Sequence, residues 1–252
     1  MRIGAWLTEV ADVRPAAEAG AFGVLLDTGS DTGSVTAAEV ATLTRDCRVL
    51  VRVLLGTENP VTLAEEVAVL DHLSAGRVVV LVDPGALSDQ AAAEDLALLR
   101  ACWSGRPVAH HGARWQVPSG VMGEGMPERI AITPVPSQVE LAVWLTRAVP
   151  GVDLPEVIDD PAAARPDRQV QPGVAELTGD LARDRALVTA WSDAGVTHLL
   201  LRPPAPAGRV AAGTEAATFF GLYVARYLQP EVSMPGFPRI MAEADLPARW
   251  GR

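Results

Sequence analysis

Strand-like and helix-like segments alternate regularly over the first hundred residues, and this alternation limits the fold more than any other feature of the chain. Four short apolar segments bounded by turn residues are predicted as strands. They cover residues 2–7, 22–27, 48–55 and 77–82. Each is followed by a segment with helical spacing, and successive βα units imply parallel strands with right-handed crossovers. The strand at 48–55 is interpreted as apolar on both faces, as in a sheet covered by helices or closed into a barrel.

The ends of the predicted helices carry recognisable signals. Asn59 precedes a proline at the start of one helix, which Gly76 ends. Ser88 is placed to cap the next helix, and Thr36 is expected to cap a helix over 37–45. These signals agree with the apolar pattern and support a series of βα units.

The second half of the chain is less regular, although 1–252 is interpreted as a single domain. We expect a loop or hairpin at 104–117, strands at 128–133 and 139–146, and a long proline-rich loop with at most short elements at 150–179. Thr178 or Asp180 then caps a helix ending near Ala194. A strand over 196–201, a helix over 214–228 and a surface tail over 230–252 complete the prediction.

Composition excludes several classes of function. The formal net charge is −10, so an acidic surface should repel phosphate backbones, and nucleic acid is not expected as a partner. All 21 basic residues are arginine, which excludes a Walker A loop, a Schiff-base lysine and a pyridoxal-phosphate anchor. Any bound phosphate must therefore be held by arginine, hydroxyl groups or backbone N–H groups.

The sequence favours a cytoplasmic protein without a membrane anchor. Its longest strictly aliphatic run, at 78–82, is far too short to span a bilayer, and the N-terminal residues become polar too soon for a signal peptide. Cys47 and Cys102 are expected as reduced core thiols. No metal site is expected, because the adjacent His110 and His111 would point in opposite directions in an extended chain. His198 alternates with apolar residues and is expected in the core.

Four segments resemble the bacterial luciferase-like flavin-dependent oxidoreductases and occur in that family's order. The most specific is LDHLSAGR at 70–77, within a helix–strand signature at 63–82. The others are LLGT at 54–57, WSGRPV at 103–108 with Gly112, and ITPVPSQ at 132–138. The resemblance covers about residues 1–148, with a weaker match at 180–228. It implies a TIM-type (β/α)8 barrel, incomplete in its second half, with the signature residues holding the fold.

The resemblance also implies where a cofactor would bind, because such barrels carry their sites at the carboxyl ends of the strands. Gly56 and Thr57 would allow a close backbone approach, and Trp6 would form a wall against a flavin ring. Arg147 and Arg202 are the best candidates to hold a phosphate. The alternatives are that Trp6 fills the barrel core and that the two arginines make surface ion pairs.

The chain departs from the family at two positions. Many members carry a histidine just after the second strand, whereas this chain has Asp27 there, which would be a substitute acid or base. Asp83, at the exit of the fourth strand, would repel a nearby flavin phosphate. The chain is also shorter than typical members, with the loss falling around 150–180.

Two functions therefore stay open, and a barrel that has lost its cofactor altogether is a third and weaker possibility. The leading one is a luciferase-like oxidoreductase or monooxygenase that uses reduced FMN or a deazaflavin coenzyme, without metal, on a small organic substrate. The alternative is a non-catalytic flavin-binding or scaffold member of the same fold. By resemblance, the protein is expected to pair as a homodimer through the helices at about 37–46 and 61–75.

Overall fold

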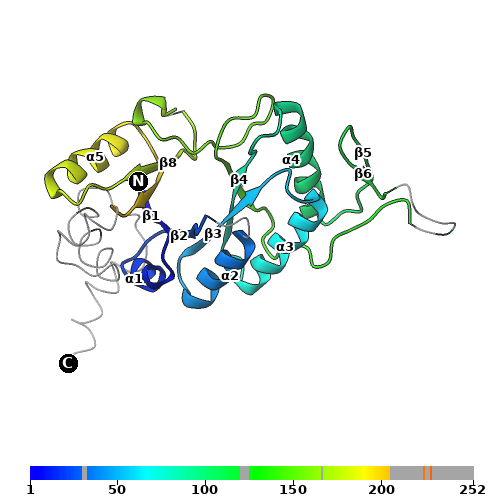
Figure 1. The fold of residues 1–252 in the computed structure, drawn as a ribbon, viewed down its shortest axis with the longest axis horizontal. Coiled ribbons are helices and arrows are strands. Elements are labelled where there is room, and N and C mark those ends of the chain that lie inside the picture. The colour runs from blue at the N-terminus through cyan, green and yellow to red at the C-terminus, as the bar shows by residue number, and fades with distance from the viewer. Residues whose placement is uncertain are drawn as a thin grey trace.

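The computed structural model describes residues 1–29, 33–119, 125, 127–165, 167–204, 224 and 228. Among these residues, seven parallel strands form one sheet in the order β7-β4-β3-β2-β1-β9-β8. The strands are β1 (Arg2–Leu7), β2 (Gly23–Leu26), β3 (Arg48–Leu54), β4 (Val78–Asp83), β7 (Ala142–Leu145), β8 (Pro172–Glu176) and β9 (His198–Arg202). Figure 1 shows the sheet curling, with helices packed along its outside.

Five α-helices and two 3-10 turns cover the described part of the sheet. They are η1 (Val10–Asp12), α1 (Val13–Glu18), α2 (Gly33–Leu43), α3 (Pro60–Leu73), α4 (Asp89–Trp103), η2 (Pro161–Ala163) and α5 (Leu181–Asp193). Asn59, Ser88 and Asp180 each accept a hydrogen bond from a backbone N–H in the first turn of the helix that follows. The helix starts predicted at these three residues are therefore confirmed.

A short segment at residues 155–158 joins the two edges of the sheet. On one side, Leu145 N–H donates to the carbonyl of Pro155 and Val157 N–H donates to that of Leu145, both over 2.8 Å. On the other, Ile158 makes parallel bridge contacts with β8 around Gly173. The ring of strands is thus closed through a short eighth member, as in a (β/α)8 barrel.

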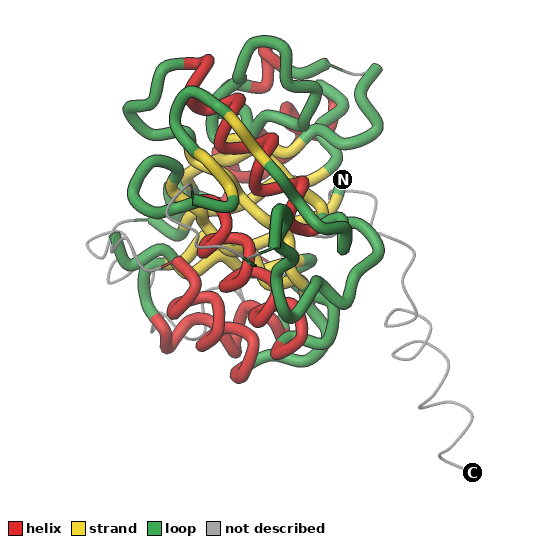
Figure 2. The backbone as a smooth tube through the Cα atoms, turned by 90° about the vertical axis from the view of Figure 1, so that its right-hand side faces the viewer, coloured by secondary structure: helices red, strands yellow, loops and turns green. Residues whose placement is uncertain are grey.

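The barrel is incomplete in its second half, as the resemblance implied. In the described residues, no α-helix lies between β7 and residues 155–158, and only the short η2 lies between that segment and β8. Figure 2 shows strands at the centre of the molecule with helices around part of them. The side wall formed by 155–158 therefore lacks the outer helix layer that covers β1 to β4.

Alternate strand residues point into the barrel and fill it. Leu50, Leu81, Trp144 and Leu200 belong to one inner cluster, while their neighbours along each strand pack outward against the helices. At Gly4 a Cβ atom would lie 2.7 Å from the side chain of Leu200, so this position has no room for a larger residue. The barrel interior is a packed core rather than a channel.

An aromatic cluster closes the amino-terminal end of the barrel. The ring of His198 lies 4.6 Å from that of Phe22 and 5.4 Å from that of Trp144, measured between centroids. Burial, with the nearby charge of Arg2, lowers the pKa of His198 to about 4. His198 is therefore neutral at pH 7, and it is half-buried at the end of the barrel rather than fully inside the core as predicted.

The signature segment links distant parts of the chain. Asp71 is fully buried in α3 and accepts hydrogen bonds from the hydroxyl of Ser137 and from the backbone and side-chain amides of Gln138. Burial would raise the pKa of Asp71, but these hydrogen bonds outweigh it and lower the pKa. Arg77 donates to four acceptors near the end of α2, including the carbonyls of Ala41 and Cys47. These contacts agree with the expected fold-holding role.

The predicted excursion after α4 contains a hairpin of β5 (His110–His111) and β6 (Gln116–Val117). Glu94 of α4 accepts hydrogen bonds from the backbone N–H groups of residues 113–115 and contacts the ring of His110. Burial opposes ionisation, yet these hydrogen bonds lower the pKa of Glu94 to about 2. The fully buried Asp95 accepts from the side chain of Trp115. Two carboxylates thus fasten the hairpin, which projects to one side in Figure 1.

Several local predictions are wrong. Helix α2 begins at Gly33, and Thr36 lies inside its first turn with its hydroxyl donating to the carbonyl of Gly33. In place of a strand at 128–133 the structure has a single bridge from Ile130 to Val108. The expected loop at 150–179 contains the short elements η2 and β8, as that prediction allowed. The strand at 48–55 is not apolar on both faces, because it contains the half-buried Arg52.

Other predictions fall wholly or partly outside the described residues. Of the helix expected at 214–228, only Val224 and Leu228 are described, and both are buried in the outer hydrophobic cluster. The tail expected at 230–252 lies outside the described residues. Cys47 and Cys102 are free and buried, as predicted, and burial raises the pKa of Cys102 to about 11.

Replacing Asp71 with alanine should destabilise the fold. The substitution removes the buried acceptor of three hydrogen bonds from the exposed Ser137 and the half-buried Gln138, at a cost of about 1–3 kcal/mol in the free energy of unfolding. Equilibrium urea unfolding measures this cost, with the exposed Asp193→Ala as the matched control. Equal midpoints for the two variants would contradict the structural role of Asp71.

Candidate active site

The carboxyl ends of the strands bring six side chains to the inner face of the barrel mouth. Because side chains alternate along a strand, these residues point to the same face as the inner core residues and lie nearer the carboxyl end of each strand. They are Trp6 of β1, Asp27 after β2, Arg52 of β3, Asp83 of β4, Thr146 after β7 and Arg202 of β9. Four of the six carry a formal charge, so the mouth is polar although the core beneath it is not.

One half of the mouth is occupied by an ion-pair cluster of Asp27, Arg52 and Asp83. The Arg52 guanidinium lies 2.6 Å from Asp83 Oδ2 and 3.5 Å from Asp27 Oδ2. The other oxygen of each carboxylate accepts a backbone N–H, from Gly29 for Asp27 and from Gly85 for Asp83. The Arg52 side chain is 35% exposed, against 16% and 19% for the two aspartates. Arg52 is thus the most accessible member of the cluster.

The charge on Asp83 is compensated within this cluster. Burial would raise its pKa, but hydrogen bonds from Arg52, the Gly85 N–H and Thr146 outweigh burial and lower it. Asp83 is therefore ionised at pH 7 and paired, which weakens the repulsion of a phosphate that the sequence suggested.

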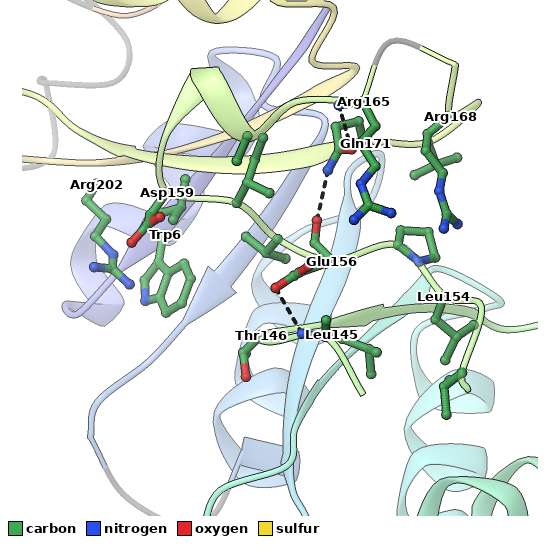
Figure 3. A pocket seen from close by; sticks show the side chains of 18 residues that line it. Trp6, Leu145, Thr146, Leu154, Glu156, Asp159, Arg165, Arg168, Gln171 and Arg202 are labelled. Carbon is green, nitrogen blue, oxygen red and sulfur yellow. Dashed lines mark hydrogen bonds between the residues drawn. The ribbon is translucent and has the colours of Figure 1, made fainter. Parts of the chain in front are cut away.

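A cavity of about 650 Å³ opens beside the cluster, within the usual size of a small-molecule site. It lies along residues 155–158, where the barrel lacks its outer helix, and extends from the mouth to the loop before β8 (Figure 3). Leu145, Val157 and Val174 supply apolar lining. Polar and charged lining comes from Thr146, Glu156, Asp159, Arg165, Arg168, Gln171 and Arg202.

Two of the predicted cofactor residues, Trp6 and Arg202, line this cavity together. The guanidinium carbon of Arg202 lies 3.9 Å from the centroid of the Trp6 ring, in a cation–π contact. Trp6 also packs on the inner core cluster. Trp6 thus fills part of the core and also borders the cavity. The two predictions for this residue, a core side chain and a wall of a cofactor site, are therefore compatible.

Hydrogen bonds fix the polar wall of the cavity. The carboxylate of Glu156 accepts from the backbone N–H of Ala148 over 2.9 Å. Gln171, only 4% exposed, donates to the carbonyl of Glu156 over 3.0 Å and accepts from the N–H of Arg165 over 3.3 Å. Gln171 therefore ties the closing segment 155–158 to the loop that carries Arg165.

The remaining predicted cofactor residues lie outside the cavity lining. Arg147 pairs with Asp89 over 2.8 Å and donates to the carbonyl of Leu87 over 2.9 Å, which is the arrangement expected of a surface ion pair. Gly56 has a φ of +86°, and a Cβ atom there would contact Leu87 at 3.0 Å. The Thr57 hydroxyl donates to a backbone carbonyl. Asp27 lies in the ion-pair cluster of the mouth and not in the cavity wall.

Sequence reasoning missed three charged residues of this region. Arg52 carried a signal, because it is the one charged residue between the ends of an otherwise apolar strand. Arg165 and Arg168 carried little signal, because they lie in a proline-rich stretch without periodicity. In the described residues, no group of three or more His, Cys, Asp or Glu side chains is arranged to hold a metal ion.

The family model for luciferase-like monooxygenases matches residues 5–150, more than half of the chain. The chain belongs to the luciferase-like monooxygenase family. No curated protein matches it by sequence. Among the described residues, no helix is long and apolar enough to cross a membrane.

Solved structures of luciferase-like enzymes share the fold at low sequence identity. An F420-dependent secondary alcohol dehydrogenase in complex with an F420–acetone adduct is 12% identical, with a TM-score of 0.68 over 92% of this chain and 99% of that chain. The coenzyme F420-dependent tetrahydromethanopterin reductase from Methanopyrus kandleri is 10% identical, with a TM-score of 0.63 over 92% and 100%. The oxygenating constituent of 3,6-diketocamphane monooxygenase from Pseudomonas putida, in complex with FMN, is 14% identical, with a TM-score of 0.50 over 77% and 62%.

The ion-pair cluster should contribute to stability in a pH-dependent way. Arg52→Met leaves two half-buried carboxylates without their cation and should lower the free energy of unfolding at pH 7 by about 1–2 kcal/mol. Because the pKa of Asp83 is lowered in the folded protein, its contribution is present above its unfolded pKa and is lost as pH falls through the folded value. The cost of Arg52→Met should therefore shrink below about pH 4.

Urea unfolding at pH 7 and at pH 3.5 checks this expectation. The lower pH lies below the unfolded-state pKa of about 4, so the stabilising contribution of Asp83 has begun to fall there. Arg45→Met, at an exposed position, is the matched control. A cost for Arg52→Met that stays the same or grows at the lower pH would show that the cluster does not stabilise the mouth.

Proposed function

We propose that this protein is an oxidoreductase that binds reduced FMN or a deazaflavin coenzyme in the mouth cavity and acts on a small organic substrate. The observation that carries the proposal is the cavity of about 650 Å³ at the carboxyl ends of the strands, bordered by Trp6 and Arg202. A flat ring system needs an apolar or aromatic wall, and a phosphorylated tail needs cationic donors. This cavity supplies both from residues on its own lining.

The neighbours in fold are consistent with either cofactor. The two that align over nearly all of this chain are F420-dependent, and the third is in complex with FMN. F420 is a deazaflavin, so both cofactor classes predicted from the sequence occur among these relatives. Their substrates differ, and the substrate of this chain is therefore proposed only as a small organic molecule.

The residues present fit such a cofactor. Trp6 would pack against the ring, and Arg202, held over Trp6, would face an anionic group of the tail. Leu145, Val157 and Val174 would exclude water from the ring. A bound flavin or deazaflavin would supply the capacity to exchange a hydride with the substrate.

Asp27 is the residue we propose for proton transfer. It stands where many relatives carry a histidine, and its position is fixed by Arg52 and by the Gly29 N–H. A carboxylate held in this way would accept the proton of a substrate hydroxyl at the mouth in the direction in which the hydride passes to an oxidised deazaflavin. The Arg52 guanidinium, which is more exposed than Asp27, would face the substrate beside this carboxylate.

The alternative is a non-catalytic flavin-binding or scaffold member. The observation that favours it is the same ion pair, because Asp27 already has a cationic partner and the mouth lacks the histidine of many relatives. Turnover of alcohol and aldehyde substrates, compared between the wild type and Asp27→Asn, separates the two functions. Cofactor binding without turnover would favour the scaffold role.

Cofactor binding provides the direct test. Titration with FMN and with the deazaflavin coenzyme, both in their fluorescent oxidised forms, should show saturable binding of at least one. Trp6→Ala removes the ring wall and should weaken that binding at least about tenfold, the equivalent of one aromatic contact of about 1.4 kcal/mol. Trp103→Phe, on the outer face of the barrel, is the control and should have no effect on binding. Lack of binding by both cofactors would refute the proposed function.

We also propose that the protein forms a homodimer through α2 and α3. These helices pack on each other and expose Val35, Val69 and Leu73, whose exposed fractions are 64%, 54% and 53%. Val69 and Leu73 lie one turn apart on the same face of α3, and exposed apolar side chains on neighbouring helices are typical of an interface. Val69→Glu/Leu73→Glu should convert a dimer to a monomer in sedimentation-velocity experiments. Monomeric wild type at micromolar concentration would contradict this proposal.

A further inference from the structure

The cavity has two chemically different ends. Trp6, Asp159 and Arg202 lie at the mouth end, and Arg165 and Arg168 lie at the other, as Figure 3 shows. The acidic side chain at the mouth end offsets the charge of Arg202 there. The far end carries two guanidinium groups on the cavity lining against the one carboxylate of Asp153, which pairs with Arg168, and thus has the greater local positive charge. A ligand with an aromatic ring at one end and an anionic group at the other would be oriented by this asymmetry.

A turn brings the two arginines together. The N–H of Arg168 donates to the carbonyl of Arg165 over 3.0 Å, which holds the backbones of these two residues close together. Gln171 accepts the N–H of Arg165 and is itself buried, so the start of the turn is fixed to the barrel wall. The two guanidinium groups are therefore attached to a fixed backbone, although the side chain of Arg165 is exposed and that of Arg168 is half-buried.

Arg168 already binds a carboxylate. Its guanidinium donates to Asp153 Oδ1 over 2.6 Å, and the Asp153 side chain is 87% exposed. An exposed ion pair of this kind contributes little to stability and exchanges readily with other anions. Asp153 thus occupies a position that the carboxylate of a ligand could take.

From these observations we propose that Arg165 and Arg168 form a subsite for an oligocarboxylate tail, so that this chain selects a deazaflavin coenzyme over FMN. The inference rests on the proposed function, because it assumes that the ring lies near Trp6. The deazaflavin coenzyme carries a phosphodiester followed by several glutamyl carboxylates, whereas FMN ends in a single phosphate. Only the longer tail offers one anionic group to Arg202 and further ones to the Arg165–Arg168 turn.

These two arginines lie outside residues 5–150, the part of the chain that the family model matches. They come from the proline-rich stretch in which this barrel replaces regular βα units with a closing segment and a loop. The proposed subsite thus lies in the part of this chain that differs from a regular barrel, and not in the βα units that the family model matches.

The test compares the binding of three probes: the deazaflavin coenzyme with its glutamyl tail, the same deazaflavin riboside lacking phosphate and tail, and FMN. The wild type should bind the tailed coenzyme at least about tenfold more tightly than the tail-less ring, as expected of added charge-assisted hydrogen bonds. Arg165→Gln/Arg168→Gln should remove most of that advantage and leave the affinity for the tail-less ring unchanged. Arg106→Gln, at an exposed position outside the cavity lining, is the control and should bind as the wild type does.

A second variant tests the same subsite in the opposite direction. Asp153→Asn removes the carboxylate that pairs with Arg168 and should strengthen binding of the tailed coenzyme several-fold, with no change for the tail-less ring. The salt dependence of tailed-coenzyme binding should also become weaker in the double arginine variant, because fewer charges are paired on binding.

The outcomes separate the two proposals. If the ring binds but the tail adds no affinity, or if the double variant weakens both deazaflavin probes equally, the tail subsite is refuted and the proposed function stands. If no probe binds, the proposed function fails and the subsite with it. Preferential binding of FMN over the tailed coenzyme would refute the subsite alone.

Discussion

Closure of the sheet through residues 155–158 is the constraint on which the rest of the structure depends. The hydrogen bonds of this segment with Leu145 on one side and β8 on the other complete a ring of parallel strands. Because the ring is closed, the carboxyl ends of all its strands converge on one mouth. Because the segment is short and lacks a covering helix, it also leaves a cavity along its side. The shortened half of the barrel thus creates the proposed site.

The mouth combines two arrangements with different consequences. The ion-pair cluster centred on Arg52 fixes Asp27 and Asp83 and fills one half of the mouth with paired charges. The other half opens into the cavity beside Trp6 and Arg202. Paired charges in a half-buried position cost desolvation and are held by additional backbone hydrogen bonds from Gly29 and Gly85. This division would place the proposed cofactor on one side of the mouth and the groups proposed to act on substrate on the other.

The sequence predicted the βα half of the fold well and the site only in part. Regular apolar spacing and caps such as Asn59 and Ser88 are local signals, and the structure confirms them. The strand β8 was missed because Pro172 and Gly173 read as loop residues, and its pairing comes from partners distant in the sequence. Trp6 and Arg202 were predicted as cofactor residues and lie together, although no local signal links them. Arg147 shows the limit of such reasoning, because its partner Asp89 is 58 positions away in the chain.

Hydrogen–deuterium exchange with and without the deazaflavin coenzyme tests the central claim most directly, since the claim is that the closing segment forms one wall of a cofactor site. The account predicts that the amides of Val157, Ile158 and Val174, which are hydrogen-bonded across the closure, exchange slowly in the free protein and more slowly with the coenzyme bound. Fast exchange of these amides in the free protein, or protection by the coenzyme confined to strands away from this wall, would contradict it.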